Sequence, residues 1–372
     1  MHVPLLHGAN SSIIYNFRDM YSFFGIFEYS RKSDNEPGLN ILRQKFPTAF
    51  GTAVTVENQR MQLMGDLVCS THANGSNLYL CGELYGSDAP LFRTVQQLHE
   101  RINQIGLSAA TAELNGRFML CYLEAGGQTA HLLTDHLAIQ QVFVHRGEDL
   151  LLFASELRFL LQHPRCPKKI DWKNALRRSI PFEVLDGERN YSAWFEDIEM
   201  LEEASGIRLD VRSGILDKFT YWHPYAQQPS SNYRNAAEVE DAYMELLEDA
   251  VRLRTQESGP AYSFLSGGLD SSILCALAAK EKPVESFSII TQTTLLEETS
   301  ALCSQLAKDL GIRNKQFTVP LHRLSSDSNL WKKRVWRAES PFAHNDSMTK
   351  TLLHDAIRRL HPDIGYTLTG TG

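Results

Sequence analysis

The stretch SFLSGGLDSS, residues 263–272, runs from apolar residues into two glycines, an aspartate and a row of hydroxyl side chains. Gly267 and Gly268 allow the backbone to turn sharply and to approach a ligand closely, because glycine has no Cβ. At the start of a helix, free N–H groups and the helix dipole favour an anion, and the serine hydroxyls add further donors. The stretch therefore predicts a phosphate-binding loop.

Asp270 is the unusual member of this loop, because its carboxylate repels the anion that its neighbours attract. A cation removes the conflict, and a carboxylate beside a polyphosphate is a usual ligand of magnesium. We therefore expect a nucleotide that binds together with Mg²⁺. The loop fits neither GxxxxGK[ST] nor GxGxxG, so a kinase-like or dinucleotide-binding function has no support. A plain glycine turn before a serine-capped helix is the alternative without a ligand.

The elements around the loop alternate between helix and strand, which predicts a parallel sheet covered on both faces by helices. In such sheets ligands bind beyond the carboxyl ends of the strands, where this loop lies. The expected helices cover residues 236–254, the segment after the loop, 299–310 and 347–360, and the expected strands cover 261–265, 285–290 and 364–369.

The first half of the chain has a different pattern. Short β-rich runs separated by turn residues, with one amphipathic helix over 91–104, predict an α+β domain with packed sheets. Residues 223–235, rich in proline and small polar residues, predict a linker between a first domain of residues 1–222 and a second of 236–372. The expected strands cover residues 23–29, 78–86, 117–124, 129–135 and 151–155.

Composition limits the function classes. The chain has 372 residues, enough for two cores, and a formal charge of -7, which offers no general attraction for nucleic acid or an acidic membrane. Its six cysteines form no CxxC pair, and no apolar run approaches the ~18 residues of a membrane span. We expect a cytoplasmic protein without nucleic-acid or membrane partners, whose basic runs at 168–169 and 332–334 are solvated.

SGGLDSS after FL, followed by FSII after the next helix, resembles the pyrophosphate-loop ATP-binding domain of the asparagine synthetase family. The first half is similar to this family as well. CGELYG (81–86) stands where the family has a segment like NGEIYN, LNGRF (114–118) where it has LxGMF, and TDHLAIQQVF (134–143) where it has RDxLGIxPLY; FASELRFLL (153–161) is nearly the family's text.

This resemblance implies the fold and the cofactors. The fold is an N-terminal Ntn-hydrolase-like αββα sandwich, of the class II glutamine amidotransferase type, followed by an α/β parallel-sheet domain of the adenine-nucleotide alpha-hydrolase type. The cofactors are ATP and Mg²⁺. Leu265 and Ile289 would touch the adenine, Asp270 would hold the metal, and Thr369 and Gly370 in TLTGTG would lie beside the nucleotide. The phosphates would contact Ser266, Gly267, Gly268, Leu269, Asp270, Ser271 and Ser272.

The implied activity is that of an amide-forming ligase. Such an enzyme adenylates a carboxylate, releases pyrophosphate and completes the amide with ammonia or an amine. Glu339 in RAESPF stands where the family has an essential glutamate that serves the amide-forming step. Asparagine synthesis is the family's default, the substrate is a small-molecule or peptide carboxylate, and a homodimer is left open.

The first domain departs from the family at two positions. Phe24 replaces the nucleophilic cysteine of the glutamine-using members, and Cys81 replaces the asparagine of the oxyanion hole, while Glu83 is retained. We therefore expect no glutamine hydrolysis. β-Lactam synthetases and lasso-peptide cyclases share this loss and close an amide within one substrate, which is an alternative function.

The chain also ends at Gly372, before the acidic metal ligand and the late lysine of the family's synthetase domain. This length suggests a C-terminally truncated domain. A nucleotide-binding remnant without activity, or a scaffold whose first domain presents a peptide, therefore remains an alternative to a working ligase.

Overall fold

The computed structural model describes residues 3–4, 21–29, 36–50, 54–57, 61–86, 91–179, 193–224, 233–256, 259–291, 296–319, 328–339, 345–362, 364 and 366–369. The chain divides into two units, one of residues 13–229 and the other of residues 1–12 and 230–372. The dividing point lies inside the expected linker, of which residues 225–232 are outside the described part. Residues 1–12 group with the second unit because Val3 and Pro4 pair with a strand of its sheet.

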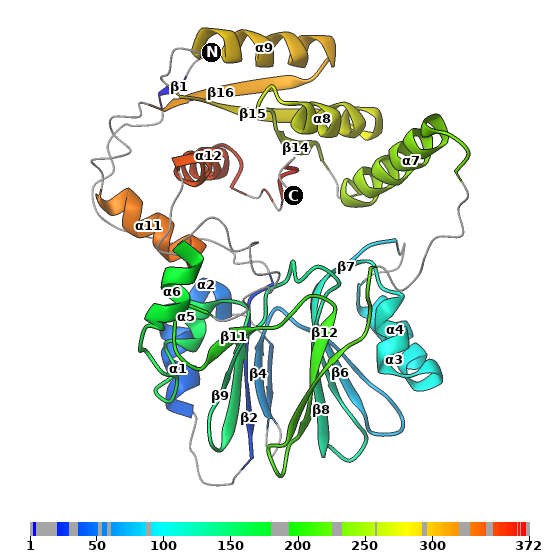
Figure 1. Cartoon of the computed structure of the whole chain (residues 1–372), viewed down its shortest axis with the longest axis vertical. Helices are drawn as coiled ribbons and strands as arrows, with labels where there is room; N and C mark the ends of the chain where they lie inside the picture. Colours follow the sequence, from blue (N-terminus) through cyan, green and yellow to red (C-terminus); the bar gives the residue numbers. More distant parts are fainter. Residues whose placement is uncertain are drawn as a thin grey trace. The chain divides into compact units, whose positions relative to one another are not determined.

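Within its described residues, the unit of residues 13–229 contains two antiparallel sheets of six strands each (Figure 1). The first sheet has the order β11 (Ile198–Met200), β9 (Phe143–Arg146), β10 (Leu150–Ala154), β2 (Phe23–Glu28), β4 (Met61–Gly65) and β3 (Val54–Glu57). The second has the order β13 (Leu216–Thr220), β12 (Ser205–Asp210), β8 (Thr129–Thr134), β7 (Gly116–Leu123), β6 (Asn77–Leu84) and β5 (Val68–Thr71).

The alternation of side chains along the strands builds the layers. In β2, Phe23 and Phe27 point into the core between the two sheets, whereas Phe24 and Ile26 point into a second core beneath helices. A third core packs α3 and α4 on the other sheet, which gives the α/β/β/α order of layers implied by the resemblance. The helices of this unit are α1 (Glu36–Lys45), α2 (Pro47–Phe50), α3 (Leu91–Ile105), α4 (Leu107–Ala112), α5 (Leu157–Leu160) and α6 (Trp172–Ser179).

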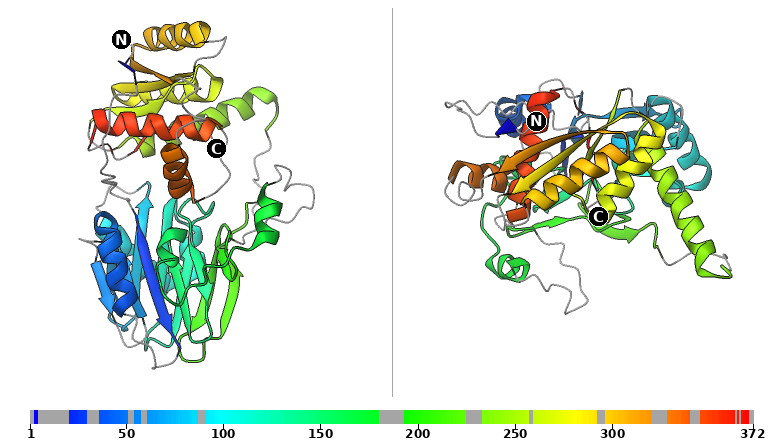
Figure 2. Two further views of the ribbon diagram at one scale, coloured as in Figure 1. Left: turned by 90° about the vertical axis from the view of Figure 1, so that its left-hand side faces the viewer. Right: turned by 90° about the horizontal axis from the view of Figure 1, so that it is seen from above.

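The other unit is built on a parallel sheet with the order β1 (Val3–Pro4), β16 (Arg313–Val319), β15 (Val284–Thr291) and β14 (Ala261–Phe264). Helices α8 (Leu269–Glu281) and α9 (Leu296–Asp309) cover one face, and α12 (Asn345–Leu360) covers the other (Figures 1 and 2). Two more helices, α7 (Ala236–Arg254) and α11 (Ser328–Ala338), pack against α8 and α12. The predicted α/β architecture of this half is therefore present.

Three differences from the expectations concern this unit. Strand β16 was not anticipated, and of the strand expected over 364–369 the described residues contain only one bridge, between Ser263 and Leu368. The basic run at 332–334 is solvated only in part: Lys332 is exposed, but Arg334 is only 5% exposed and Lys333 pairs with Asp355 at 2.5 Å. The run lies on α11, which packs against α12, so two of its three cations are part of the packing.

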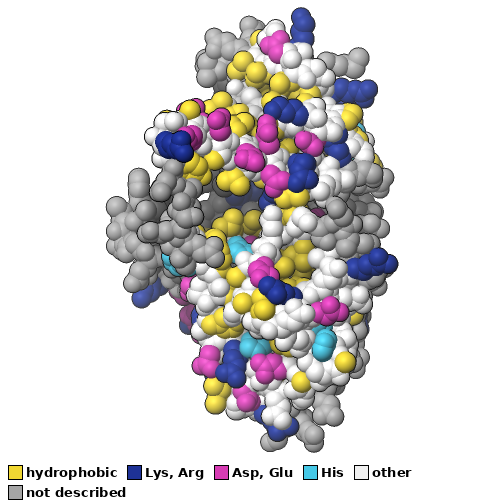
Figure 3. Space-filling model, turned by 90° about the vertical axis from the view of Figure 1, so that its right-hand side faces the viewer, with side chains coloured by type: hydrophobic (Ala, Val, Ile, Leu, Met, Phe, Trp, Pro, Cys, Tyr) yellow, Lys and Arg dark blue, Asp and Glu magenta, His cyan; other side chains and the backbone are white. Residues whose placement is uncertain are grey.

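On the face shown in Figure 3, acidic and basic side chains of the described residues lie interspersed with hydrophobic ones. No helix in the described part of the chain is long and apolar enough to cross a membrane.

Candidate functional site

The glycine-rich loop lies where a parallel sheet is expected to bind its ligand. It follows the carboxyl end of β14 and leads directly into α8, whose N-cap is Gly268. The first N–H groups of a helix have no partner within the helix, so they remain available to an anion in front of it.

Hydrogen bonds within the loop fix its shape. The hydroxyl of Ser271 lies 2.9 Å from that of Ser266 and accepts from the Ser266 N–H at 3.2 Å. The Gly268 N–H donates to the Ser266 hydroxyl at 3.3 Å, and the Ser272 hydroxyl donates to the Gly268 carbonyl at 2.7 Å. Ser271 is buried, whereas Ser266 and Gly268 are exposed. Hydrogen bonds therefore fix the loop on its buried side, and its other side is exposed.

Gly267 is required for this conformation. Its φ of +82° belongs to the left-handed region that side chains other than glycine rarely adopt. A Cβ built at this position would lie 3.0 Å from Cδ2 of Leu302 and 3.7 Å from Sγ of Cys303. Backbone conformation and the neighbouring helix α9 therefore both disfavour a side chain.

The residues beneath the loop were not identified from the sequence. The Ser288 hydroxyl donates to the Leu265 carbonyl at 2.6 Å, and the Asn314 amide donates to the Ser288 hydroxyl at 3.0 Å. The Cys303 thiol also points to the Leu265 carbonyl, at 3.5 Å. The two serines of ESFSII, polar residues inside a buried strand, were the sequence signal that could have indicated this support.

The predicted adenine contacts gather at the same edge of the sheet. Ser263 bridges to Leu368, so Thr369 lies beside the end of β14, and Ile289 continues β15 just past the level of Leu265. Thr369 is exposed and Ile289 half-buried. The Leu265 side chain is fully buried beneath α8 and α9, which leaves only its backbone near a ligand. Gly370 lies outside the described residues.

Asp270 is exposed in the first turn of α8, so its carboxylate can reach a cation in front of the loop. In the described part of the chain, no group of three His, Cys, Asp or Glu side chains could hold a metal on its own. A Mg²⁺ ion at this position would therefore take Asp270 together with phosphate oxygens and water, its usual ligand set. The loop therefore has groups that fit both the phosphates and the Mg²⁺ of MgATP.

Glu339 follows directly after the end of α11 and has a φ of +48°. A glutamate in the left-handed region is uncommon, and such conformations persist only where the surrounding structure enforces them. Its assignment to amide formation remains a prediction from the resemblance.

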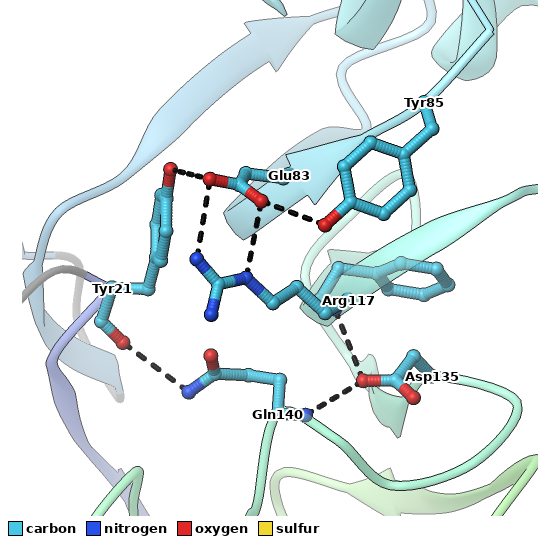
Figure 4. A network of polar contacts seen from close by, with 7 residues as sticks. Tyr21, Glu83, Tyr85, Arg117, Asp135 and Gln140 are labelled. Atoms are coloured by element: carbon cyan, nitrogen blue, oxygen red, sulfur yellow. Dashed lines mark hydrogen bonds and ion pairs between the residues drawn. The ribbon is translucent and has the colours of Figure 1, made fainter. Parts of the chain in front are cut away.

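The retained Glu83 of the first unit lies in a network of polar side chains (Figure 4). One of its oxygens accepts from the Tyr21 hydroxyl at 2.6 Å and from Arg117 at 3.2 Å. The other accepts from the Tyr85 hydroxyl at 2.8 Å and from Nε of Arg117 at 3.1 Å. Each carboxylate oxygen therefore already has two donors from the chain itself.

Burial alone would raise the pKa of the Glu83 carboxyl, but the hydrogen bonds from Tyr21, Arg117 and Tyr85 and the guanidinium charge outweigh it and lower the pKa. Burial and the hydrogen bond to Glu83 raise the pKa of Tyr21. The network is therefore a carboxylate paired with a guanidinium, with neutral tyrosines beside it. The signal for it in the sequence was Arg117, which stands at the methionine of LxGMF.

Phe24 and Cys81 offer no nucleophile in the structure. Phe24 is fully buried within β2, paired with Met64 on one side and Ala154 on the other, and its ring stacks on His163. Burial, and to a smaller extent the charge of Asp66, raise the pKa of the Cys81 thiol well above its usual range, so it stays protonated.

Comparison with known proteins shows what the chain is similar to. Residues 242–372 match the family model described as Asparagine synthase. The chain is 27% identical over 268 residues to asparagine synthetase [glutamine-hydrolyzing] 2 of Bacillus subtilis, covering 70% of this chain and 36% of that protein. It is 26% identical over 171 residues to putative asparagine synthetase [glutamine-hydrolyzing] 2 of Methanocaldococcus jannaschii, covering 46% and 32%. The chain thus spans about a third of the length of these relatives.

Among solved structures, the allosteric regulatory enzyme of purine biosynthesis aligns with a TM-score of 0.36 at 11% identity, over 80% of each chain.

Proposed function

We propose that this chain, which belongs to the asparagine synthetase family, acts as an ATP-dependent ligase that joins a carboxylate to ammonia or an amine. We further propose that its sandwich is of the Ntn-hydrolase type and its parallel-sheet unit of the adenine-nucleotide alpha-hydrolase type. The conformation of the 266–272 loop is the observation that carries the proposal. Its hydroxyls are tied to one another beneath the backbone, and its outer side presents the start of α8.

In this proposal the residues of the loop bind and orient the phosphates. The N–H groups at the start of α8 take the phosphate oxygens, and Asp270 takes the metal. When bound, MgATP supplies the adenylyl group that activates the carboxylate and releases pyrophosphate. Ile289 and Thr369, at the neighbouring strand ends, border the base, and Glu339 serves the amide-forming step.

The first unit is proposed not to hydrolyse glutamine. Three observations support this: Phe24 is buried without a nucleophile, the Cys81 thiol is protonated, and Glu83 is saturated by its own neighbours. The nitrogen then comes from free ammonia or from an amine of the substrate. The second of these, closure of an amide within one substrate, is favoured over glutamine use by the same observations.

The test is ATP–pyrophosphate exchange on the purified chain, first with aspartate and then with peptides that carry a free carboxylate. We expect exchange with one of them and its loss in Asp270→Ala. The matched control is Asp309→Ala, which removes an exposed aspartate of α9 away from the loop. Equal exchange in Asp270→Ala and the unmodified chain would refute the role of the loop.

A separate assay tests the first unit. Glutamine is added in place of ammonia, and released glutamate is measured. We expect none above the level of a heat-denatured sample, and release that disappears with Glu83→Gln would overturn the assignment.

A further inference from the structure

The turn that follows α5, residues 161–166, contains a histidine buried against the first sheet. His163 is only 1% exposed, and its ring stacks on that of Phe24 in β2, with 6.1 Å between the ring centroids. Two backbone hydrogen bonds shape the turn: the His163 N–H donates to the Leu160 carbonyl, and the Cys166 N–H donates to the His163 carbonyl. The histidine therefore fixes the turn, and with it the end of α5, on the sheet.

A hydrogen bond sets the protonation state of the His163 ring. Its Nδ1 lies 3.3 Å from the backbone nitrogen of Arg165, and because a backbone N–H can only donate, Nδ1 is the acceptor. The proton of the ring is therefore on Nε2, and the ring is neutral. A second proton would have to bind Nδ1, where it would meet the Arg165 N–H.

The surroundings of His163 contain little that could balance a positive charge. The charge of His145 on β9 acts against it, and Nδ1 of His145 donates to the Asp197 carbonyl at 2.8 Å. The other charged and titratable side chains near α5 and its turn are the pairs Glu156 with Arg158 and Asp149 with Arg165, together with Lys45 of α1, which donates to Gln162, and the Cys166 thiol. Both carboxylates in this set pair with an arginine, so within the described residues a charged His163 gains no carboxylate of its own.

This environment makes the closed turn sensitive to acid. Burial, and to a smaller extent the charge of His145, lower the pKa of His163 to about 4. In an open turn the pKa returns to its ordinary value near 6.5, so protons bind the open turn more strongly than the closed one. The closed turn keeps its full advantage above pH 6.5 and loses it as pH falls from 6.5 toward 4.

We propose that the turn of residues 161–166 is an acid-sensitive latch, which holds α5 on the first sheet at neutral pH and releases it when His163 takes up a proton. Release uncovers Leu157, Phe159 and Leu160, the residues of α5 that pack in the core beneath β2. The latch belongs to the unit of residues 13–229, so it is separate from the nucleotide loop.

The test is thiol labelling of the full chain with dipyridyl disulfide at pH 7 and at pH 5. Cys166 is 4% exposed at the end of the latch, whereas Cys121 is buried between the two sheets of the same unit. Each labelling rate is measured by mass spectrometry and divided by the rate of the same cysteine in urea at the same pH, which removes the effect of pH on the reagent. We expect the corrected rate of Cys166 to rise about tenfold or more from pH 7 to pH 5, and that of Cys121 to stay nearly unchanged.

His163→Asn separates the titration of this side chain from its packing. The Oδ1 atom of asparagine can accept from the Arg165 N–H in place of Nδ1, but asparagine takes up no proton in this pH range. The rise at Cys166 is therefore expected to disappear. The matched control is His223→Asn, which removes an exposed histidine of the same unit and should leave the rise in place.

Three results would overturn the latch. They are a corrected rate of Cys166 that does not rise, an equal rise at Cys121, which would mean that the whole unit unfolds in acid, and a rise that His163→Asn retains. The two cysteines are compared in the unmodified chain, so the test remains decisive even where His163→Asn does not fold.

Discussion

The nucleotide loop and the Glu83 network both contain hydrogen-bonded polar groups. They differ in which of these groups their internal hydrogen bonds leave available to a ligand. In the loop, the serine hydroxyls bond to one another and to the backbone beneath, so the side toward the ligand keeps its donors. In the network, the Glu83 carboxylate accepts hydrogen bonds from Tyr21, Tyr85 and Arg117, which occupy its acceptor sites. Glu83 therefore has less hydrogen-bonding capacity left for a ligand than the groups at the start of α8.

Among the variants that test this comparison, Gly267→Ala should have the largest effect. A side chain at φ +82° costs about 1–2 kcal/mol, and the contact with Leu302 adds to it, so the loop must move away from its ligand-ready shape. We expect the affinity for MgATP to fall about a hundredfold. The measurement is a titration with a fluorescent ATP analogue.

Gly311→Ala is the control for Gly267→Ala. Gly311 has a φ of +66° in the same unit, but nothing lies within 4 Å of the Cβ that would be added. An alanine here adds only the energetic cost of a side chain at positive φ, without a steric contact. The affinity for MgATP should therefore stay unchanged. An equal loss of affinity in both variants would mean that general destabilisation, rather than loop shape, is responsible.

Arg117→Met tests the other side of the comparison. It leaves the Glu83 carboxylate, 23% exposed, with only the two tyrosine donors. The loss in free energy of unfolding should be about 1–3 kcal/mol, measured by urea denaturation.

The control for this variant is Arg101→Met, because Arg101 makes the same two-bond contact with Glu113 in a far more exposed position. Water replaces that interaction, so the destabilisation should be clearly smaller. An equal loss in free energy of unfolding in the two variants would mean that the contact of Arg117 with Glu83 contributes no more than an exposed ion pair.

A smaller effect is expected from pH. The folded chain lowers the pKa of Glu83 below its usual value near 4.5, so the carboxylate contributes stability above that value and loses it as pH falls through the folded pKa. Glu83→Gln should therefore be less stable than the unmodified chain at neutral pH, and the difference should shrink below about pH 4.5. Urea midpoints between pH 7 and pH 3 measure it. A difference that stays constant over this range would exclude the ionised carboxylate as its cause.

Much of this structure could be predicted from the chain because its signals are local. The loop, its strand and its helix occupy consecutive residues, and the helix expected over 236–254 has those bounds in the structure. The supports of the two sites come from distant segments. Ser288 lies 23 residues from Leu265, and Tyr21 lies 62 residues from Glu83, so only the folded register brings them together.

The amphipathic pattern of α7 shows a second limit. Periodicity places Val239, Tyr243, Leu246, Leu247 and Ala250 on one apolar face, but it cannot tell how much of that face another element covers. Of these residues Leu247 packs on the core, together with Val251, whereas Val239, Tyr243 and Leu246 are exposed. Periodicity therefore gives the direction of a helix face and leaves its burial to the tertiary structure.

The exposed apolar side chains of α7 also bear on how the protein behaves in solution. Val239 is 46% exposed, Tyr243 63% and Leu246 70%, so exposed apolar side chains recur along about two turns of α7. We expect these side chains to bind hydrophobic dyes and to favour self-association as the protein concentration rises. The acidic residues beside them, Glu238 and Glu245 among them, oppose this association by charge repulsion, and added salt screens that repulsion. We therefore expect the chain to associate less at low than at high ionic strength.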